Sequence, residues 1–296
     1  MLTEKLGWPH PEGYPLIMTG AGLCKTFDPT RIAEYARAAD MAVIGSITLA
    51  PRPGNDGDLV YLEDPAFGLN AFGMPNPGLV GLQDPGRDNV IVSIAGFCPE
   101  EYWELFAALS SYSAGVEFNF GCPNAGHPPL SYDPNALAAV LACIKRPEEE
   151  RRRLIGAKLS PIGDFGMLRE IASVIGESWV DYVAVCNTFP NGAARLKNGA
   201  SAIRTKQTGR LGGVSGAALR PISLGQAIQF REALPDHVDV IRVGGIDSGW
   251  DVVDSVEEGC AGVQIVTAVA TKGVGLLHSI RQEYADIIGE TPGGAS

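Results

Sequence analysis

Eight short runs of β-branched and other apolar residues recur along the chain, and segments with helical periodicity separate most of them. Strands that alternate with helices pair in parallel, because each helical crossover returns the chain to the same side of the sheet. A (β/α)8 barrel needs about 250 residues, and this chain has 296. We therefore expect an α/β fold, a TIM barrel built as a single domain over residues 1–296. The expected strands are 14–18, 41–47, 90–95, 115–120, 154–159, 182–186, 238–243 and 262–266.

The helical segments carry recognisable start signals. Asp28 and Asp133 each precede a proline, which is typical of an N-cap followed by proline at the first helical position. Two long segments, 51–88 and 187–216, break the alternation, and we expect them to form inserted loops or short strands over the C-terminal mouth of the barrel. The expected helices are 29–39, 99–110, 134–145, 166–176, 217–234, 249–258 and 275–288.

Composition narrows the class of protein. Hydrophobic residues make up 45% and charged residues 19% of the chain, as in globular proteins. The formal net charge of −11 argues against nucleic acid or an anionic membrane surface as partner. No signal peptide or long apolar run is evident, which predicts a soluble, cytoplasmic protein. The six cysteines and four histidines are dispersed and predict neither a disulfide framework nor a metal site.

One thiol stands out from this dispersed set. Cys122 follows an apolar run and lies between Asn119 and Asn124, with Pro123 ending the strand. A cysteine taken alone is more often a small buried side chain. Two neighbouring amides would need partners in a core, so we interpret Cys122 as a base or nucleophile at a strand end.

Lys158 and two glycine-rich segments complete the chemical pattern. An inward lysine on a barrel strand is costly to bury without an anionic partner, and the Schiff-base lysine of an aldolase is a competing interpretation. Gly244 and Gly245 follow the seventh expected strand, and the loops after strands seven and eight form the usual phosphate site of such barrels. A phosphate-bearing cofactor such as FMN or a sugar-phosphate substrate would fit.

Several segments together resemble the dihydroorotate dehydrogenases, flavoenzymes built on a (β/α)8 barrel. The loop around Cys122 looks most like the soluble class 1A branch, whose members are homodimers, so the resemblance implies a homodimer, FMN as cofactor and a role in pyrimidine biosynthesis. The segments that carry the resemblance are 18–22 (MTGAG), 69–76 (LNAFGMPN), 92–96 (VSIAG), 119–124 (NFGCPN), 126–134 (GHPPLSYDP) and 187–192 (NTFPNG).

The resemblance also implies residue roles. Cys122 would remove a proton from C5 of a dihydropyrimidine while N5 of FMN accepts hydride from C6, with Lys158 beside the flavin; fumarate, a quinone or oxygen would then accept the electrons. The implied substrate-binding residues are Asn70, Phe72, Gly73, Met74, Asn119, Asn124, Asn187 and Thr188. The implied FMN-binding residues are Ala21, Gly22, Gly45, Ser46, Asn119, Lys158, Gly213, Ser215, Gly216, Gly244, Gly245, Val266 and Thr267.

The chain departs from the family at the end of the second strand. The family has lysine in a K-[ST]-x-T segment where this chain has Gly45, and Phe72 replaces the usual methionine. A charge-assisted hydrogen bond to the orotate carboxylate, worth about 1.5–3 kcal/mol, is thereby lost. The substrate would then lack the carboxylate, or Lys25 or Arg52 would supply the cation. A cofactor-free, phosphate-binding lyase or isomerase using Lys158, and a relative that has lost catalysis, are the alternatives.

Overall fold

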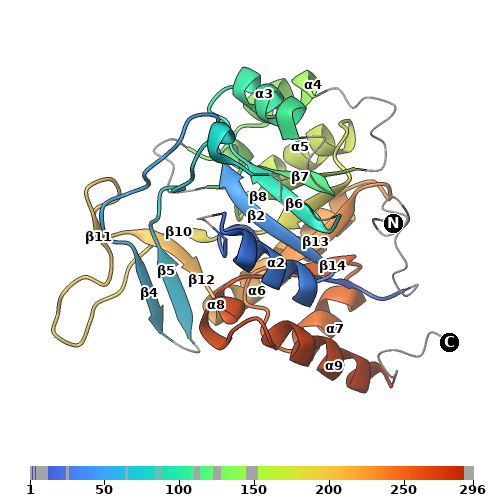
Figure 1. The fold of residues 1–296 in the computed structure, drawn as a ribbon. Coiled ribbons are helices and arrows are strands. Elements are labelled where there is room, and N and C mark those ends of the chain that lie inside the picture. Colours follow the sequence, from blue (N-terminus) through green and yellow to red (C-terminus); the bar gives the residue numbers. More distant parts are fainter. Residues whose placement is uncertain are drawn as a thin grey trace.

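A closed barrel of eight parallel strands forms the centre of the protein (Figure 1). The computed structural model describes residues 2, 4, 13–24, 27–63, 66–83, 86, 88–109, 114–122, 128–144 and 153–289. Around the barrel the strand order is β1-β14-β13-β9-β8-β7-β6-β2. The TIM-barrel prediction is confirmed, and each strand lies within two residues of its expected bounds. The barrel strands are β1 (Leu16–Thr19), β2 (Met41–Ile47), β6 (Val90–Ile94), β7 (Gly115–Asn119), β8 (Leu154–Leu159), β9 (Tyr182–Val185), β13 (Asp239–Val243) and β14 (Gly262–Ile265).

Helices cover the outside of the barrel, and their ends follow the capping signals in the sequence. Asp28 accepts a hydrogen bond from the backbone of Thr30, and Asp133 accepts one from Ala136. The segment expected as one helix over 217–234 begins with a 3-10 turn, η4 (Ala217–Leu219). The helices are α2 (Pro29–Ala38), α3 (Pro99–Leu109), α4 (Pro134–Cys143), α5 (Phe165–Gly176), α6 (Arg220–Ala233), α7 (Gly249–Glu257), α8 (Thr267–Lys272) and α9 (Leu276–Ile288).

Helix α8 is absent from the sequence expectations, since six residues are too few to show a helical period. It directly follows β14 and contributes Thr267 and Lys272 to the functional cavity described below. No helix in the described part of the chain has the length and apolar character needed to cross a membrane.

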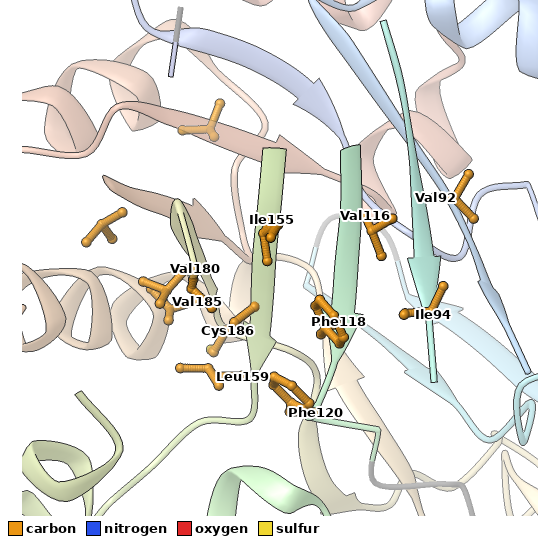
Figure 2. Packing of buried hydrophobic residues seen from close by; sticks show 14 of the residues in the cluster. Val92, Ile94, Val116, Phe118, Phe120, Ile155, Leu159, Val180, Val185 and Cys186 are labelled. Carbon is orange, nitrogen blue, oxygen red and sulfur yellow. The ribbon is translucent and has the colours of Figure 1, made fainter. Parts of the chain in front are cut away.

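The main hydrophobic core lies between the strands and the helices. Val116 and Phe118 point to this side of β7, and Phe118 stacks on Phe120 with ring centroids 5.6 Å apart. Figure 2 shows these rings beside Leu159 on the neighbouring strand. Burying one such side chain contributes about 1.5–3 kcal/mol. Because side chains alternate along each strand, the residues between these outward-facing ones must point into the barrel.

The barrel interior is apolar at one end and polar toward its mouth. A second core cluster, which includes Met18, Val43 and Ile241, fills the inside. Because side chains alternate along a strand, Glu117 and Lys158 lie on the opposite side from Val116 and Ala157, and both are buried. The charged residues of the interior are thus placed below the C-terminal ends of the strands.

The two segments that interrupt the alternation pair with each other. Strands β4 (Val60–Glu63) and β5 (Phe67–Asn70) come from the first, and β10 (Phe189–Gly192) and β12 (Gly212–Ser215) come from the second. They form one antiparallel sheet in the order β10-β12-β5-β4, which stands to one side of the barrel in Figure 1. Two short strands, β3 (Gly57–Asp58) and β11 (Arg204–Thr205), join the same segments again.

Candidate active site

A cavity of about 300 Å³ lies between the C-terminal ends of the barrel strands and the inserted sheet. Its lining includes residues at or just after the ends of β2, β7, β8, β9, β13 and β14, together with residues of β4, β5 and β12. Catalytic groups of TIM barrels come from this end of the barrel, where several strands deliver side chains to one place. The cavity is therefore the candidate active site.

Most residues expected from the sequence to form the site line this cavity. Two of them do not. Gly213 lies behind the wall, where its carbonyl accepts a hydrogen bond of 3.4 Å from Asn70, and Asn124 falls outside the described residues. The expected residues that line the cavity are Ala21, Gly22, Gly45, Ser46, Asn70, Phe72, Gly73, Met74, Asn119, Cys122, Lys158, Asn187, Thr188, Ser215, Gly216, Gly244, Gly245, Val266 and Thr267.

Other lining residues were not expected from the sequence. Val60 and Leu62 on β4 reach the cavity only because the inserted hairpin folds against the barrel, which no local pattern reveals. Cys186 also lines it, one residue before the expected Asn187. Gln264 was within reach of sequence reasoning, since its position on the eighth strand has the inward phase of that strand.

Two amide and two hydroxyl side chains from the ends of β9, β7, β2 and β6 form one hydrogen-bonded chain at the mouth. Asn187 donates to Asn119 (3.3 Å), Asn119 donates to Ser46 (2.8 Å), and the hydroxyls of Ser46 and Ser93 are 2.9 Å apart. Each amide offers both a donor and an acceptor. This pre-arranged set suits a heterocycle that carries amide groups of its own.

Cys122 lies three residues beyond the end of β7 and is half-buried at the edge of the cavity. The preceding backbone is held firmly: the Gly121 amide donates to the side chain of Asn119 (3.2 Å), and Ser160 donates to the Gly121 carbonyl (3.3 Å). A Cβ at Gly121 would lie 2.6 Å from the backbone nitrogen of Ser160, so this close approach of β7 to β8 requires glycine. The thiol is thus presented from a fixed strand end.

Lys158 points into the barrel from β8 and is only 5% exposed. Its ammonium donates to the Oε1 atom of Gln264 at 3.4 Å. Burial lowers the pKa of Lys158, and the charge of Glu117 is the leading influence that acts in the opposite direction and raises it. An ammonium at this place can stabilise negative charge on a ligand in the cavity.

The far end of the cavity contains glycines and the basic side chain of Lys272. Gly244 and Gly245 have φ values of +122° and +76°, and a Cβ at Gly245 would lie 2.5 Å from the Cα of Arg220. Glycine therefore allows the backbone to pass close to α6 while leaving its amides near the cavity. Lys272 lines the same end, 3.3 Å from Asp247. Such a loop can hold the phosphate of a cofactor.

The substrate end offers little positive charge. Gly45 stands where the resemblance leads one to expect lysine, and Arg52 does not line the cavity: its Nε donates to the Gly73 carbonyl (3.4 Å), and its guanidinium lies 4.9 Å from the centre of the Phe97 ring. Lys25 falls outside the described residues. Among the described residues, the cationic side chains that line the cavity are Lys158 and Lys272.

Comparisons with known proteins agree with this arrangement. The sequence profile of the family described as "Dihydroorotate dehydrogenase" matches residues 14–288. The chain is 31% identical over 301 residues to "Dihydroorotate dehydrogenase B (NAD(+)), catalytic subunit" of Methanopyrus kandleri, covering 97% of this chain and 90% of that protein. It is 29% identical to "Dihydroorotate dehydrogenase (fumarate)" of Saccharomyces cerevisiae, covering 82% and 80%.

Solved structures show the same fold. A crystal structure of DHODH from Eimeria tenella in complex with ferulenol has a TM-score of 0.75 and 18% sequence identity, and the match covers 92% of this chain and 81% of that one. The ligand-free form from the same organism has a TM-score of 0.74. The profile match covers most of the chain, and similar proteins include one named for NAD(+) and one named for fumarate. This chain therefore belongs to the dihydroorotate dehydrogenase family of oxidoreductases.

Proposed function

We propose that this chain is a single-domain, FMN-dependent oxidoreductase that oxidises dihydroorotate or a related dihydropyrimidine. The observation that carries the proposal is the meeting of Cys122, Lys158 and the amides of Asn119 and Asn187 in one cavity. These groups come from the ends of three strands, β7, β8 and β9, yet they face a common space. The combination supplies a base, a cation and heterocycle-binding amides.

The residues divide the proposed reaction between them. Cys122 takes the proton from C5 of the substrate, so that the C5–C6 bond becomes a double bond when hydride leaves C6. The sulfur accepts this proton as the thiolate, so Cys122 first releases its own proton to solvent, and the thiol is re-formed when the C5 proton arrives. Asn70, Asn119 and Asn187 hold the ring amides and orient C5 toward the sulfur. When bound, FMN supplies the hydride acceptor at its N5 atom.

Several features of the cavity support FMN as the cofactor. Lys158 would face the electron-rich edge of the isoalloxazine ring, which gains negative charge on reduction. The backbone amides of Gly244 and Gly245, with the hydroxyls of Ser215 and Thr267 that are 2.9 Å apart, would hold the phosphate. The remaining FMN-binding assignments, including Gly213 behind the wall, are proposed from the resemblance.

A second candidate substrate is a dihydro-heterocycle without a carboxylate. The placement of the cavity's described cationic side chains favours it, because neither is available to a substrate carboxylate. Lys158 belongs to the proposed flavin site, and Lys272 is paired with Asp247 at the opposite end of the cavity. Phe72 adds apolar surface near the amides. A substrate carboxylate would find no charge-assisted partner among these described residues, whereas a neutral ring would need none.

The electron acceptor and the assembly state remain part of the proposal. Fumarate, a quinone or oxygen would reoxidise the flavin, and the relatives' names mention NAD(+) and fumarate as acceptors of those proteins. The resemblance to class 1A enzymes supports a cytoplasmic homodimer that contributes to pyrimidine biosynthesis. Size-exclusion chromatography with light scattering tests the dimer.

An anaerobic absorbance spectrum of the purified protein tests the function. A yellow protein that L-dihydroorotate bleaches would support dihydroorotate oxidation. Bleaching by 5,6-dihydrouracil, but not by L-dihydroorotate, would instead support the non-carboxylated substrate. A colourless protein that FMN cannot reconstitute would contradict the proposal and favour a cofactor-free lyase or isomerase using Lys158, which borohydride trapping of a Schiff base would reveal.

A further inference from the structure

A buried acid lies directly below the candidate active site, and the reaction proposed above makes no use of it. Glu117 points into the barrel from β7, two residues before Asn119, and is 0% exposed. Its Oε2 atom accepts a hydrogen bond of 2.6 Å from the side-chain amide of Gln264 and one of 3.1 Å from the hydroxyl of Tyr182. These contacts join β7 to β14 and β9 across the barrel interior.

The same chain of contacts ends at the active-site lysine. Gln264 donates to Glu117 through Nε2 and accepts from Lys158 through Oε1, so a single amide connects carboxylate and ammonium. Gln264 lies on the far side of the barrel from both residues, and its side chain spans the interior between them. Its amide can satisfy both partners in only one orientation, which gives the three-residue chain a defined polarity from Lys158 to Glu117.

The hydrogen bonds alone do not account for a buried acid here. The Oε1 atom of Glu117 has no hydrogen-bond partner among the described residues. Burying a carboxylate is costly unless it is paired with a positive charge as well as with donors. Lys158 lies on the adjacent strand: Glu117 pairs with Gly156 in the β7–β8 register, so Lys158 is two residues nearer the mouth. Its ammonium is the positive charge that interacts with Glu117.

The surroundings of Lys158 leave Glu117 as its main anionic neighbour. From β9, the titratable neighbours Tyr182 and Cys186 both have raised pKa values because of burial, Cys186 to about 12, so both are neutral near pH 7. From β14, Gln264 is not titratable, and the interior residue on β1, Met18, is apolar. Burial lowers the pKa of Lys158, and the leading influence that raises it is the charge of Glu117.

We propose that Glu117 is a positioning residue that, through the amide of Gln264, keeps Lys158 charged and aimed into the cavity. It touches neither substrate nor cofactor, so its effect on the reaction passes entirely through the lysine. The charge that Lys158 offers to a ligand is then set by an acid one layer deeper in the barrel. The relevance of Glu117 to hydride transfer rests on the proposed function. The effect of Glu117 on the charge of Lys158 does not depend on that function.

The test follows the ionisation of Lys158 without using catalysis. The purified chain is treated briefly with acetic anhydride over a range of pH, and labelling of Lys158 is quantified by mass spectrometry, with Lys272 as internal reference. Only the neutral amine reacts. In Glu117→Gln, we expect the half-maximal labelling of Lys158 to move to lower pH and its labelling rate on the acidic side to rise about tenfold or more.

The control variants separate charge from structure. Tyr182→Phe removes a hydrogen bond to Glu117 but keeps the acid, and Glu117→Asp keeps the charge; both should retain a midpoint close to that of the unmodified protein. A change in accessibility alone would raise the maximal rate and leave the midpoint in place. If Glu117→Gln does not fold, Glu117→Met removes the charge with an apolar side chain of similar length and carries the same expectation.

Two outcomes are distinguishable. An unchanged Lys158 midpoint in the variants that lack the acid would overturn this inference, whether or not the protein binds FMN. A shifted midpoint in a protein that binds no FMN would support the Glu117–Lys158 pairing and contradict the proposed function. In a flavin-loaded protein, the loss of flavin reduction at alkaline pH should begin at lower pH in Glu117→Gln than in Tyr182→Phe.

Discussion

The backbone of Gly45 lies against the carbonyl oxygen of Ser93, and a Cβ atom at Gly45 would be 2.6 Å from that oxygen. Gly45 also has a φ of +120°, a conformation that residues with side chains rarely adopt. Glycine therefore fits this position without strain, whereas a residue with a Cβ atom does not. A cation for a substrate carboxylate cannot be introduced here without moving β2 or β6.

Gly45→Lys should destabilise the protein and should not confer dihydroorotate specificity. The backbone strain and the contact with Ser93 together predict a loss of about 1–3 kcal/mol in the free energy of unfolding. Urea denaturation measures this loss. Gly163→Lys is the matched control, because a Cβ at Gly163 meets nothing within 4 Å. Equal stability of the two variants would contradict the strain at Gly45.

Cys122→Ser should slow flavin reduction while leaving FMN bound. A serine hydroxyl loses its proton far less readily than a thiol, so almost none of the basic form is present near neutral pH. Removal of a general base costs about 10²–10⁴-fold in rate. Stopped-flow absorbance at the flavin band gives the rate, and the protein-to-flavin ratio gives the occupancy. Cys143→Ser, at an exposed cysteine in α4, is the control. Unaltered reduction in Cys122→Ser would exclude the thiol as the base.

Gly245→Ala should weaken FMN binding. Its φ of +76° and the 2.5 Å approach of a Cβ to the Cα of Arg220 mean that an alanine must displace the loop after β13. A loop displaced by a few tenths of an ångström loses backbone hydrogen bonds to the phosphate, and we expect FMN affinity to fall about tenfold or more. Fluorescence titration of the apoprotein with FMN measures it, and Gly275→Ala, in open space, serves as the comparison.

Stability should fall at alkaline pH, in part because of Cys260. Burial raises the pKa of this thiol to about 12 from an ordinary value of 9.0. Below pH 9 the thiol is neutral in both states; above it, the unfolded chain loses the proton first, so unfolding becomes more favourable until about pH 12.

Cys260→Val should therefore lose less stability than the unmodified protein between pH 8 and 10.5. One group titrating over 1.5 pH units accounts for a difference of about 1–2 kcal/mol. Urea denaturation under reducing conditions at both pH values measures it. Cys143→Ser should show no such difference, since Cys143 is exposed. Parallel losses in Cys260→Val and the unmodified protein would show that the thiol ionises equally in both states.

Local pattern was enough to locate the barrel and much of the site. The apolar runs 41–47 and 154–159 coincide with β2 and β8 residue for residue, since strand length and alternation are local properties. Asp28 and Asp133 mark their helices because capping involves only neighbouring residues. Strand ends in a parallel barrel meet at one mouth, so Cys122, Lys158 and Asn187 could be grouped before any contact was known.

Which residues from distant segments contact each other was determined by the tertiary structure alone. Glu117 meets Gln264 across 147 positions of sequence, and Val60 enters the cavity only through the pairing of β4 with β5 and of β5 with β12. The sequence likewise does not show that the side chain of Arg52 contacts Phe97 and the Gly73 carbonyl rather than the cavity. Periodicity thus determined which residues face the barrel interior or its mouth, whereas partners, distances and burial followed from the way the barrel closes and the insertions fold over it.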